Sequence, residues 1–322
     1  MRIRDAAAKL NTTEAEIVAA FVGAQVVRLN TDFTGLWKRM PELGYVMSLT
    51  RNDHCVHERK GAFEKVQVGH KNMGFVVGPD IDLRMFFKHW AFGFALLGDA
   101  ESGFKKSLQI FDAQGTAITK VYLQPESDHA AFDRLIKDFA ATEQSPLLRL
   151  QPEEPVTYAD DAVDEEAFRE AWWALQDTHD FFPMLRKFKV SRLHALHIAG
   201  EGLARRVGNH NAEQLLKDAS VSGLPIMVFT GNNGNVQIHT GPVKNILEIP
   251  GWINVMDSEF NLHLKAGEIA ESWVVKKPNK ECDVHSLECY DKDGHLIVQF
   301  FGKRKPGIPE DPDWTAYVQA LK

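Results

Sequence analysis

The chain has 322 residues, 44% of them hydrophobic and 25% charged, which is a globular composition with material for about two domains. The net charge of −7 argues against a general affinity for nucleic acid or anionic membranes, although it leaves room for a local basic pocket. No apolar run reaches the roughly 18 residues that span a bilayer, and the N-terminus lacks the apolar stretch of a secretory signal. We therefore expect a cytoplasmic protein that is not membrane-embedded, with Cys55, Cys282 and Cys289 as reduced thiols.

The first half begins with two segments of helical periodicity, and strands follow them. Residues 12–22 and 33–44 repeat apolar side chains at helical spacing. Downstream, apolar and polar residues alternate around turn sequences at 51–53 and 112–115. This order predicts antiparallel hairpins with helices packed on one face of the sheet.

An acidic segment with two prolines, residues 151–166, separates the first half from a second half of the same design. Its composition is typical of a linker and places the boundary near residues 155–163. Beyond the linker, helical periodicity marks residues 164–182, 191–207 and 211–220, and alternating segments surround turn sequences at 231–235 and 292–294.

The two halves are copies of one another. At a shift of 179 and without a gap, residues 81–97 superpose on 260–276 and residues 107–122 on 286–301. At a shift of 180, residues 47–61 match the segment that ends at Gly241. A repeat of this length sets the architecture. We predict an α+β fold of two tandem pseudo-repeat domains, residues 1–158 and 159–322, each with its own core and a large antiparallel sheet flanked by helices.

No phosphate-binding loop, dinucleotide fingerprint, nucleophile elbow or HExxH zinc motif occurs, so single residues must carry any chemistry. His179 is the most informative of the 13 histidines. The residues Phe168, Trp172, Leu175, His179 and Phe182 lie at spacings of four, three, four and three, which predicts one shared helical face. A haem pocket needs such a set, because one axial nitrogen binds the iron while apolar surface covers the porphyrin. The alternative is a core histidine whose nitrogens bond to backbone or water.

The segment WWALQDTHDFFPMLRKFKVSR, residues 172–192, resembles the signature of the HemS/ChuS type of bacterial haem-utilisation proteins. There a D-x-H-x-F-F stretch supplies the proximal iron ligand, and here it contains Asp177 and His179. The resemblance continues in the same order through residues 50–61, 78–87, 226–241, 251–264, 271–278 and 298–304. It implies that His179 binds the iron of haem b, that the two sheets are stacked, and that haem lies in a cleft between the halves.

The resemblance implies further haem contacts. Arg84 matches an arginine that the family places over the distal face of the haem, where a guanidinium holds a water or donates to bound oxygen. This makes Arg84 the candidate catalytic residue, although its strand alone would leave it an ordinary solvent-facing arginine. Arg192, Lys277 and Arg304, with Gln299 as a polar neighbour, match residues that bind the haem propionates. Each of these cations alone is typical of a solvated surface charge.

Other positions depart from the family pattern or offer alternatives. The family commonly has tyrosine at the position of Phe301. Phenylalanine cannot donate a hydrogen bond, so the contact of that tyrosine is lost or replaced by a water. His57 matches a family histidine suggested as a second, weaker haem site, although its repeat partner is Gln237. His194 and His197 could offer an alternative iron ligand, or they form a partly buried helix face.

Two functions fit these residues. A carrier would keep imported haem (hemin) soluble and pass it to a dedicated oxygenase. An enzyme would cleave the porphyrin itself and release iron, with electrons from an external donor, because no flavin or nicotinamide motif is present. The expected partners in iron acquisition are haem, a haem ABC transporter on the cytosolic side, and a haem oxygenase or reductant. A regulatory interaction or DNA-binding protein is a remote alternative, because no basic recognition helix stands out.

Overall fold

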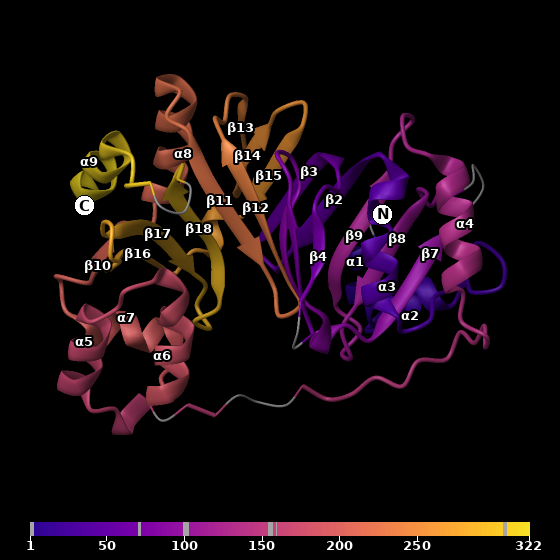
Figure 1. Cartoon of the computed structure of the whole chain (residues 1–322), viewed down its shortest axis with the longest axis horizontal. Helices are drawn as coiled ribbons and strands as arrows, with labels where there is room; N and C mark the ends of the chain where they lie inside the picture. The colour runs from indigo at the N-terminus through magenta and orange to yellow at the C-terminus, as the bar shows by residue number, and fades with distance from the viewer. Residues whose placement is uncertain (1–2, 70–71, 99–102, 154–156, 159, 305–307) are drawn as a thin grey trace.

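The computed structural model describes residues 3–69, 72–98, 103–153, 157–158, 160–304 and 308–322. Within them the strands form two nine-stranded antiparallel sheets, which we call the N sheet and the C sheet (Figure 1). The N sheet has, in spatial order, β1 (Val26–Arg28), β7 (Phe92–Leu96), β8 (Ser107–Phe111), β9 (Ala117–Leu123), β2 (Tyr45–Arg51), β3 (Cys55–Ala62), β15 (Phe260–Leu264), β14 (Trp252–Met256) and β13 (Ile246–Ile249). The C sheet has β10 (Ala204–Val207), β16 (Glu271–Lys277), β17 (Val284–Tyr290), β18 (Leu296–Gly302), β11 (Ile226–Gly231), β12 (Asn235–Gly241), β6 (Asp82–Phe86), β5 (Met73–Val77) and β4 (Val66–Val68).

Helices flank both sheets. The described α-helices are α1 (Ile3–Leu10), α2 (Glu14–Ala19), α3 (Phe33–Lys38), α4 (His129–Phe139), α5 (Glu165–Trp173), α6 (Phe181–Phe188), α7 (Arg192–Ala199), α8 (Asn211–Ser222) and α9 (Pro312–Ala320). Short 3-10 helices are η1 (Met40–Leu43), η2 (Phe87–His89), η3 (Asp160–Ala162), η4 (Thr178–Asp180) and η5 (Ala266–Glu268). None of the described helices has the length and apolar character needed to cross a membrane.

The turn sequences form as predicted, whereas four of the five predicted helical segments contain shorter α-helices than expected. The turns at 51–53, 112–115, 231–235 and 292–294 join β2 to β3, β8 to β9, β11 to β12 and β17 to β18. The segment 191–207 is helical only as far as Ala199, and Gly200 follows with a positive φ. Its end forms β10 instead, because Ala204–Val207 pairs with β16. Tertiary pairing thus overrides the local helical pattern there.

The predicted α+β fold of two repeats with stacked sheets is confirmed, but each sheet takes three strands from the other half of the chain. β15 of the second half pairs with β3 in the N sheet, from Phe260 opposite Arg59 to Leu264 opposite Cys55. By the same pattern, β6 of the first half pairs with β12 in the C sheet. The described residues that follow α4, as far as residue 153, run along one side of the molecule (Figure 1).

The hydrophobic cores, unlike the sheets, stay within the halves. One core contains Trp37, Leu83 and Phe132 and draws all its buried residues from the first half. The corresponding core around Leu216, Leu262 and Phe300 comes from the second half except for Cys55. β6 and β15 therefore bond through their backbones to the other half, while the inward side chains of the exchanged strands pack in the core of their own half.

The stacked sheets meet at their centre through buried polar side chains. Thr50 Oγ1 donates to Gln237 Oε1 at 2.8 Å and accepts from Asn235 Nδ2 at 2.7 Å. Cys55 Sγ lies 3.4 Å from Thr230 Oγ1 in the same layer. Because buried polar groups must find partners, these bonds fix how β2 and β3 lie against β11 and β12.

Candidate functional site

The outer face of the C sheet is only partly covered by helices. α5, α6 and α7 pack over one end of the sheet, on Trp273, Val275 and Tyr290. Directly paired residues share a face, so the register continues this face across β18, β11, β12 and β6. We call this uncovered part the open strip; its half-buried side chains are Gln299, Phe301, Met227, Phe229, Val236 and Arg84.

The predicted continuous helical face from Phe168 to Phe182 is wrong. α5 ends at Trp173, and the short helix η4 precedes α6. Phe168 and Trp172 are buried in the core beneath α5–α7, whereas His179 and Phe182 are exposed. A continuous helix would place Pro183 in its interior, where proline cannot donate a hydrogen bond to the carbonyl of His179. Pro183 lies instead in the first turn of α6, where that missing donor costs little.

The break in the helix exposes His179 and fixes its ring. Asp177 caps η4 by accepting a hydrogen bond from the backbone N–H of His179 at 2.8 Å. The same carboxylate oxygen lies 2.6 Å from His179 Nδ1, and the imidazole side chain is 89% exposed. With Nδ1 bonded to the carboxylate, Nε2 is the nitrogen that faces outward. A histidine oriented by a carboxylate in this way is the usual arrangement of a metal-binding imidazole.

Arg304 lies close enough to this pair to influence it. The hydrogen bonds from His179, first of all that from its backbone N–H, hold the pKa of Asp177 below its usual range, and the charge of Arg304 adds to the effect. Of the predicted propionate-binding cations, Arg304 thus acts electrostatically on the carboxylate that orients the predicted iron ligand.

Two other predicted cations, Arg192 and Lys277, are bound to a buried carboxylate that the sequence analysis missed. Glu288 is 0% exposed and accepts hydrogen bonds from Arg192 Nε and Nη2, Lys277 Nζ and Gln299 Nε2 at 2.8–3.0 Å. Tyr290 donates to it as well, at 2.7 Å. Burial alone would raise the pKa of Glu288, but the charges of Arg192 and Lys277 bring this pKa well below its usual range. The signal was a single acid within VHSLECY, a strand that is otherwise uncharged.

Aromatic rings connect this charged cluster to the open strip. The guanidinium of Arg192 lies over the rings of Phe181 and Phe182, at 5.5 and 5.1 Å from their centroids. Lys277 Nζ lies 4.7 Å from the centroid of Phe181 and 5.8 Å from that of Phe301. Phe301 in turn packs against Phe229, with centroids 4.8 Å apart. Apolar surface and positive charge thus adjoin each other over α6 and the strip.

Arg84 lies on β6, at the far side of the open strip from α6. It pairs with Val236 of β12 and is half-buried. Its guanidinium bonds to the carboxylate of Asp82 and to the backbone oxygen of Leu83, and it lies 5.7 Å from the ring centroid of Phe75. These contacts hold the side chain on the outer face rather than in the core.

The remaining histidines lie in different surroundings. His57 is 0% exposed, and both ring nitrogens are buried without a hydrogen-bond partner, so a haem could reach them only if the sheets separated. Burial lowers the pKa of His57 well below its usual value. His194 is half-buried on α7. His197 lies 3.2 Å from the carboxylate of Glu271.

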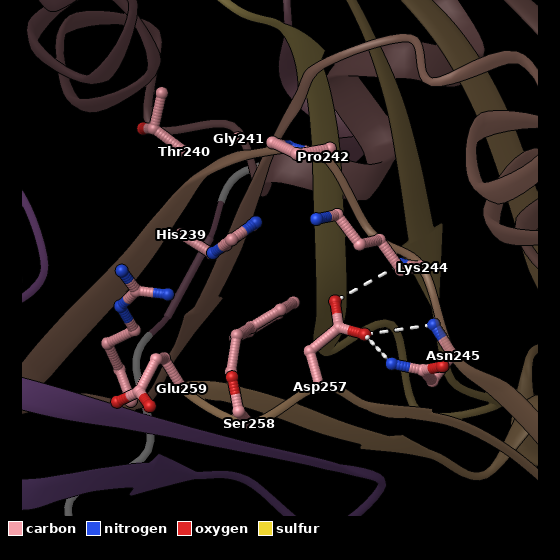
Figure 2. Close-up of a pocket in the computed structure, with 11 residues that line it drawn as sticks. His239, Thr240, Gly241, Pro242, Lys244, Asn245, Asp257, Ser258 and Glu259 are labelled. Carbon is pink, nitrogen blue, oxygen red and sulfur yellow. Dashed lines mark hydrogen bonds between the residues drawn. The ribbon is translucent and has the colours of Figure 1, made fainter.

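A hollow lies away from the outer face of the C sheet. It is lined by residues of β3, β12, the segment between β12 and β13, and the β14–β15 turn (Figure 2). Its volume is about 240 Å³, and Arg59, His239 and Lys244 are among its lining residues. Asp257 closes one side by accepting hydrogen bonds from the backbone of Lys244 and Asn245. Pockets for drug-sized ligands begin at about 300 Å³, so this hollow is too small for a porphyrin.

Known proteins share both the sequence and the fold. The family model described as "Haemin-degrading HemS.ChuX domain" matches residues 11–139 and 189–321. The hemin transport protein HemS of Yersinia enterocolitica is 37% identical over 320 residues, which cover 99% of this chain and 92% of that protein.

Two solved structures agree over the whole length. Holo-PhuS, a heme-binding protein from Pseudomonas aeruginosa, is 47% identical with a TM-score of 0.97, over 100% of this chain and 94% of that one. The heme degrading enzyme ChuS of Escherichia coli O157:H7 is 33% identical with a TM-score of 0.93, over the same shares of the two chains. This chain therefore belongs to the HemS/ChuX family, that of the haemin-degrading HemS.ChuX domain.

Proposed function

We propose that this protein binds haem b through His179 and carries it through the steps that lead to iron release. The observation that carries the proposal is the exposed imidazole of His179, anchored through Nδ1 to Asp177 at 2.6 Å. Two relatives support it, since HemS is a hemin transport protein and PhuS a heme-binding protein.

Each part of the site has a task in binding this cargo. Asp177 holds the ring of His179 in one orientation, so that Nε2 is available to the iron. Phe182, Phe229 and Phe301 offer apolar surface to the porphyrin. When bound, the haem supplies the redox chemistry of its iron, while the protein supplies burial and orientation.

The charges of the site suit the two propionates. Arg192 and Lys277 share a single carboxylate, that of Glu288, so the cluster keeps one positive charge in excess. Arg304 near Asp177 adds another positive charge, and Gln299 adds an amide on the open strip. A dianionic ligand beside this cluster would be stabilised by charge-assisted hydrogen bonds.

Haem degradation is the second candidate function. The related ChuS is described as a heme degrading enzyme and as a heme oxygenase. Arg84 lies on the open strip, where its guanidinium could donate to a ligand on the distal side of the iron. Electrons would come from an outside donor. In either case we propose that the protein works in the cytoplasm, between a haem ABC transporter and a haem oxygenase or reductant.

The binding proposal is tested by a haem titration of His179→Ala, followed at the Soret band. Loss of the axial nitrogen should weaken binding or change the coordination of the iron. His129→Ala removes an exposed imidazole on α4 and is the matched control. An unchanged spectrum and affinity in His179→Ala would overturn the assignment, whereas a shifted six-coordinate spectrum would indicate replacement by His194 or His197.

The carrier and the enzyme are distinguished by mixing the haem complex with a reductant under air, in the presence of catalase. Catalase removes free peroxide, which bleaches haem without any enzyme. A carrier keeps its Soret band and passes haem to a purified haem oxygenase. An enzyme loses the band and releases iron, and the Arg84→Ala variant should do both more slowly than the parent.

A further inference from the structure

The duplicated fold brings two equivalent pairs of turns together at the centre of the molecule. Asn52 in the β2–β3 turn donates from Nδ2 to the backbone oxygens of Gly231 and Ile297, at 3.2 and 2.8 Å. Its repeat partner Asn232 donates in the same way to Arg51 and Ile118, at 2.9 and 2.8 Å. Each asparagine therefore holds its own turn against the other half.

An aspartate shapes the second turn of each pair. Asp291 Oδ1 accepts hydrogen bonds from the backbone N–H groups of Asp293 and His295, at 2.9 and 2.8 Å. Its repeat partner Asp112 does the same for Gln114 and Thr116, at 3.0 and 2.8 Å. One carboxylate oxygen is enough for this task, which leaves Asp291 Oδ2 available.

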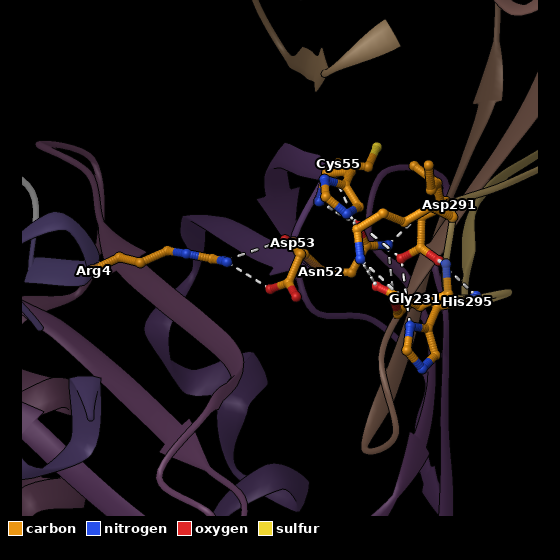
Figure 3. A network of polar contacts seen from close by, with 11 residues as sticks. Arg4, Asn52, Asp53, Cys55, Gly231, Asp291 and His295 are labelled. Atoms are coloured by element: carbon orange, nitrogen blue, oxygen red, sulfur yellow. Dashed lines mark hydrogen bonds and ion pairs between the residues drawn. The ribbon is translucent and has the colours of Figure 1, made fainter. Parts of the chain in front are cut away.

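Around Asp291 Oδ2 lie further groups that can bind a metal ion, and they come from both halves. His54 Nε2 is 3.5 Å away and His295 Nδ1 is 3.4 Å away. Donor atoms of Asp291, Asp293 and His295 all lie within 4.8 Å of one another. Figure 3 shows Asp291 and His295 beside Asn52 and Gly231, where the two turns meet.

The repeat shows that the turns do not need these donors. The equivalents of His54, Asp293 and His295 are Gly234, Gln114 and Thr116, yet the hydrogen bonds of the turns are the same in both copies. Three of the four donors thus occur on one side of the pseudo-symmetric pair only. The folding of the turns therefore does not explain why these donor side chains lie together.

We propose that His54, Asp291, Asp293 and His295 form a binding site for Zn²⁺ that joins the two halves of the chain. Zinc–nitrogen bonds of about 2.0–2.1 Å place tetrahedral ligands about 3.3–3.4 Å apart, which agrees with the two distances to Asp291 Oδ2. The same distances exceed the 2.7–2.9 Å of a strong charged hydrogen bond. Two imidazoles and two carboxylates favour zinc over magnesium, which prefers oxygen ligands.

Binding would require one small rearrangement. The carboxylate of Asp293 pairs with Lys292 Nζ at 2.7 Å, and both side chains are exposed. Exposed pairs of this kind contribute little free energy, so a divalent ion can replace the lysine. Asp291 is 8% exposed and stays in place, because the backbone of the turn holds it.

The test is zinc titration of the tag-free, full-length chain by calorimetry, with Co²⁺ as a spectroscopic probe. The parent should carry His179→Ala, so that the exposed pair of His179 and Asp177 does not compete for zinc. We expect one Zn²⁺ per chain, the intense visible bands of tetrahedral Co²⁺, no binding of Mg²⁺, and a zinc-dependent rise in the unfolding temperature.

The variants Asp293→Gln and His295→Thr introduce the residues that the first copy has in the same turn, so the fold should be kept. Each should weaken zinc binding at least about tenfold and abolish the rise in unfolding temperature. His129→Thr, which removes a remote exposed histidine, should change neither. The proposal would be overturned if the parent bound no stoichiometric zinc, or if both turn variants bound zinc with the same affinity as the parent.

Discussion

At the scale of single residues, the pair of Asp177 and His179 determines how an exposed imidazole is presented. Asp177→Asn keeps an oxygen that can cap η4 but removes the negative charge 2.6 Å from Nδ1. We expect haem affinity to fall about 10–100-fold, the usual effect of losing a residue that orients a metal-binding histidine. The measurement is a Soret titration, and unchanged circular dichroism would show that the turn survives. Equal affinity would mean that Asp177 serves only as a cap.

Phe301 stands where the family resemblance predicts a tyrosine, and a substitution can introduce that residue. The ring is half-buried on the open strip, and Lys277 Nζ lies 5.8 Å from its centroid. Phe301→Tyr adds a hydroxyl donor beside the proposed propionate site. We expect haem to bind about 2- to 10-fold more tightly, as one added hydrogen bond allows. A weaker complex would place the propionates elsewhere.

Glu288 shows how a buried carboxylate supports two buried cations. Glu288→Gln leaves Arg192 and Lys277 without their counter-charge and should cost about 3–5 kcal/mol of unfolding free energy in urea. Because the pKa of Glu288 is held below its usual range, its contribution is present above the unfolded value of about 4.3 and is lost as the pH falls. Parent stability should thus show no loss from Glu288 between pH 8 and 5. Lys277→Met in the same chain should restore part of the loss.

The sequence could indicate the ligand segment but not its geometry. The D-x-H-x-F-F stretch identifies His179 by resemblance alone, whereas the helical spacing from Phe168 to Phe182 predicts a continuous face that the structure does not have. Pro183 was the contrary signal, because a proline belongs in the first turn of a helix. Glu288 was missed for a different reason: its partners Arg192 and Lys277 lie 96 and 11 residues away, and no local pattern connects them.

At the scale of elements, the paired turns hold the two halves together. Asn232→Asp keeps the acceptor for the backbone N–H groups of Gly234 and Asn235 but removes the donor to Arg51 and Ile118. Two carbonyl oxygens lose their partner and gain a nearby charge, so we expect a loss of about 1–3 kcal/mol in unfolding free energy. Asn52→Asp should cost about the same, because it makes the equivalent change in the other turn. A large difference between the two would show that the turns are not equivalent in energy.

Hairpins were predictable because each turn is local: a short run rich in glycine, asparagine or aspartate joins two strands of alternating polarity. The order of strands within the sheets was not. β6 could pair with a strand of its own half or of the other half with the same alternation, and the repeat makes both partners alike. Only the packing of whole halves decides between such partners.

At the scale of the whole molecule, cores stay within the halves while sheets cross between them. The apolar side chains of each half can therefore collapse without the other half, but β3, β6, β12 and β15 then end as open edges. Open edges with unpaired backbone groups bind other strands. The division at 1–158 and 159–322 thus remains a prediction about folding units that the topology makes dependent on one another.

Separate expression of residues 1–155 and 163–322 tests this dependence. We expect each fragment to fold around its own core and to self-associate through its open edges, and the mixture to form a one-to-one complex. Haem should bind with full affinity only to the mixture, because His179 belongs to the second fragment and Arg84 to the first. Size-exclusion chromatography and Soret titration measure the two effects. If residues 163–322 alone bind haem as tightly as the full chain, then the first half contributes nothing to the affinity of the site, and the expected dependence of binding on both halves is wrong.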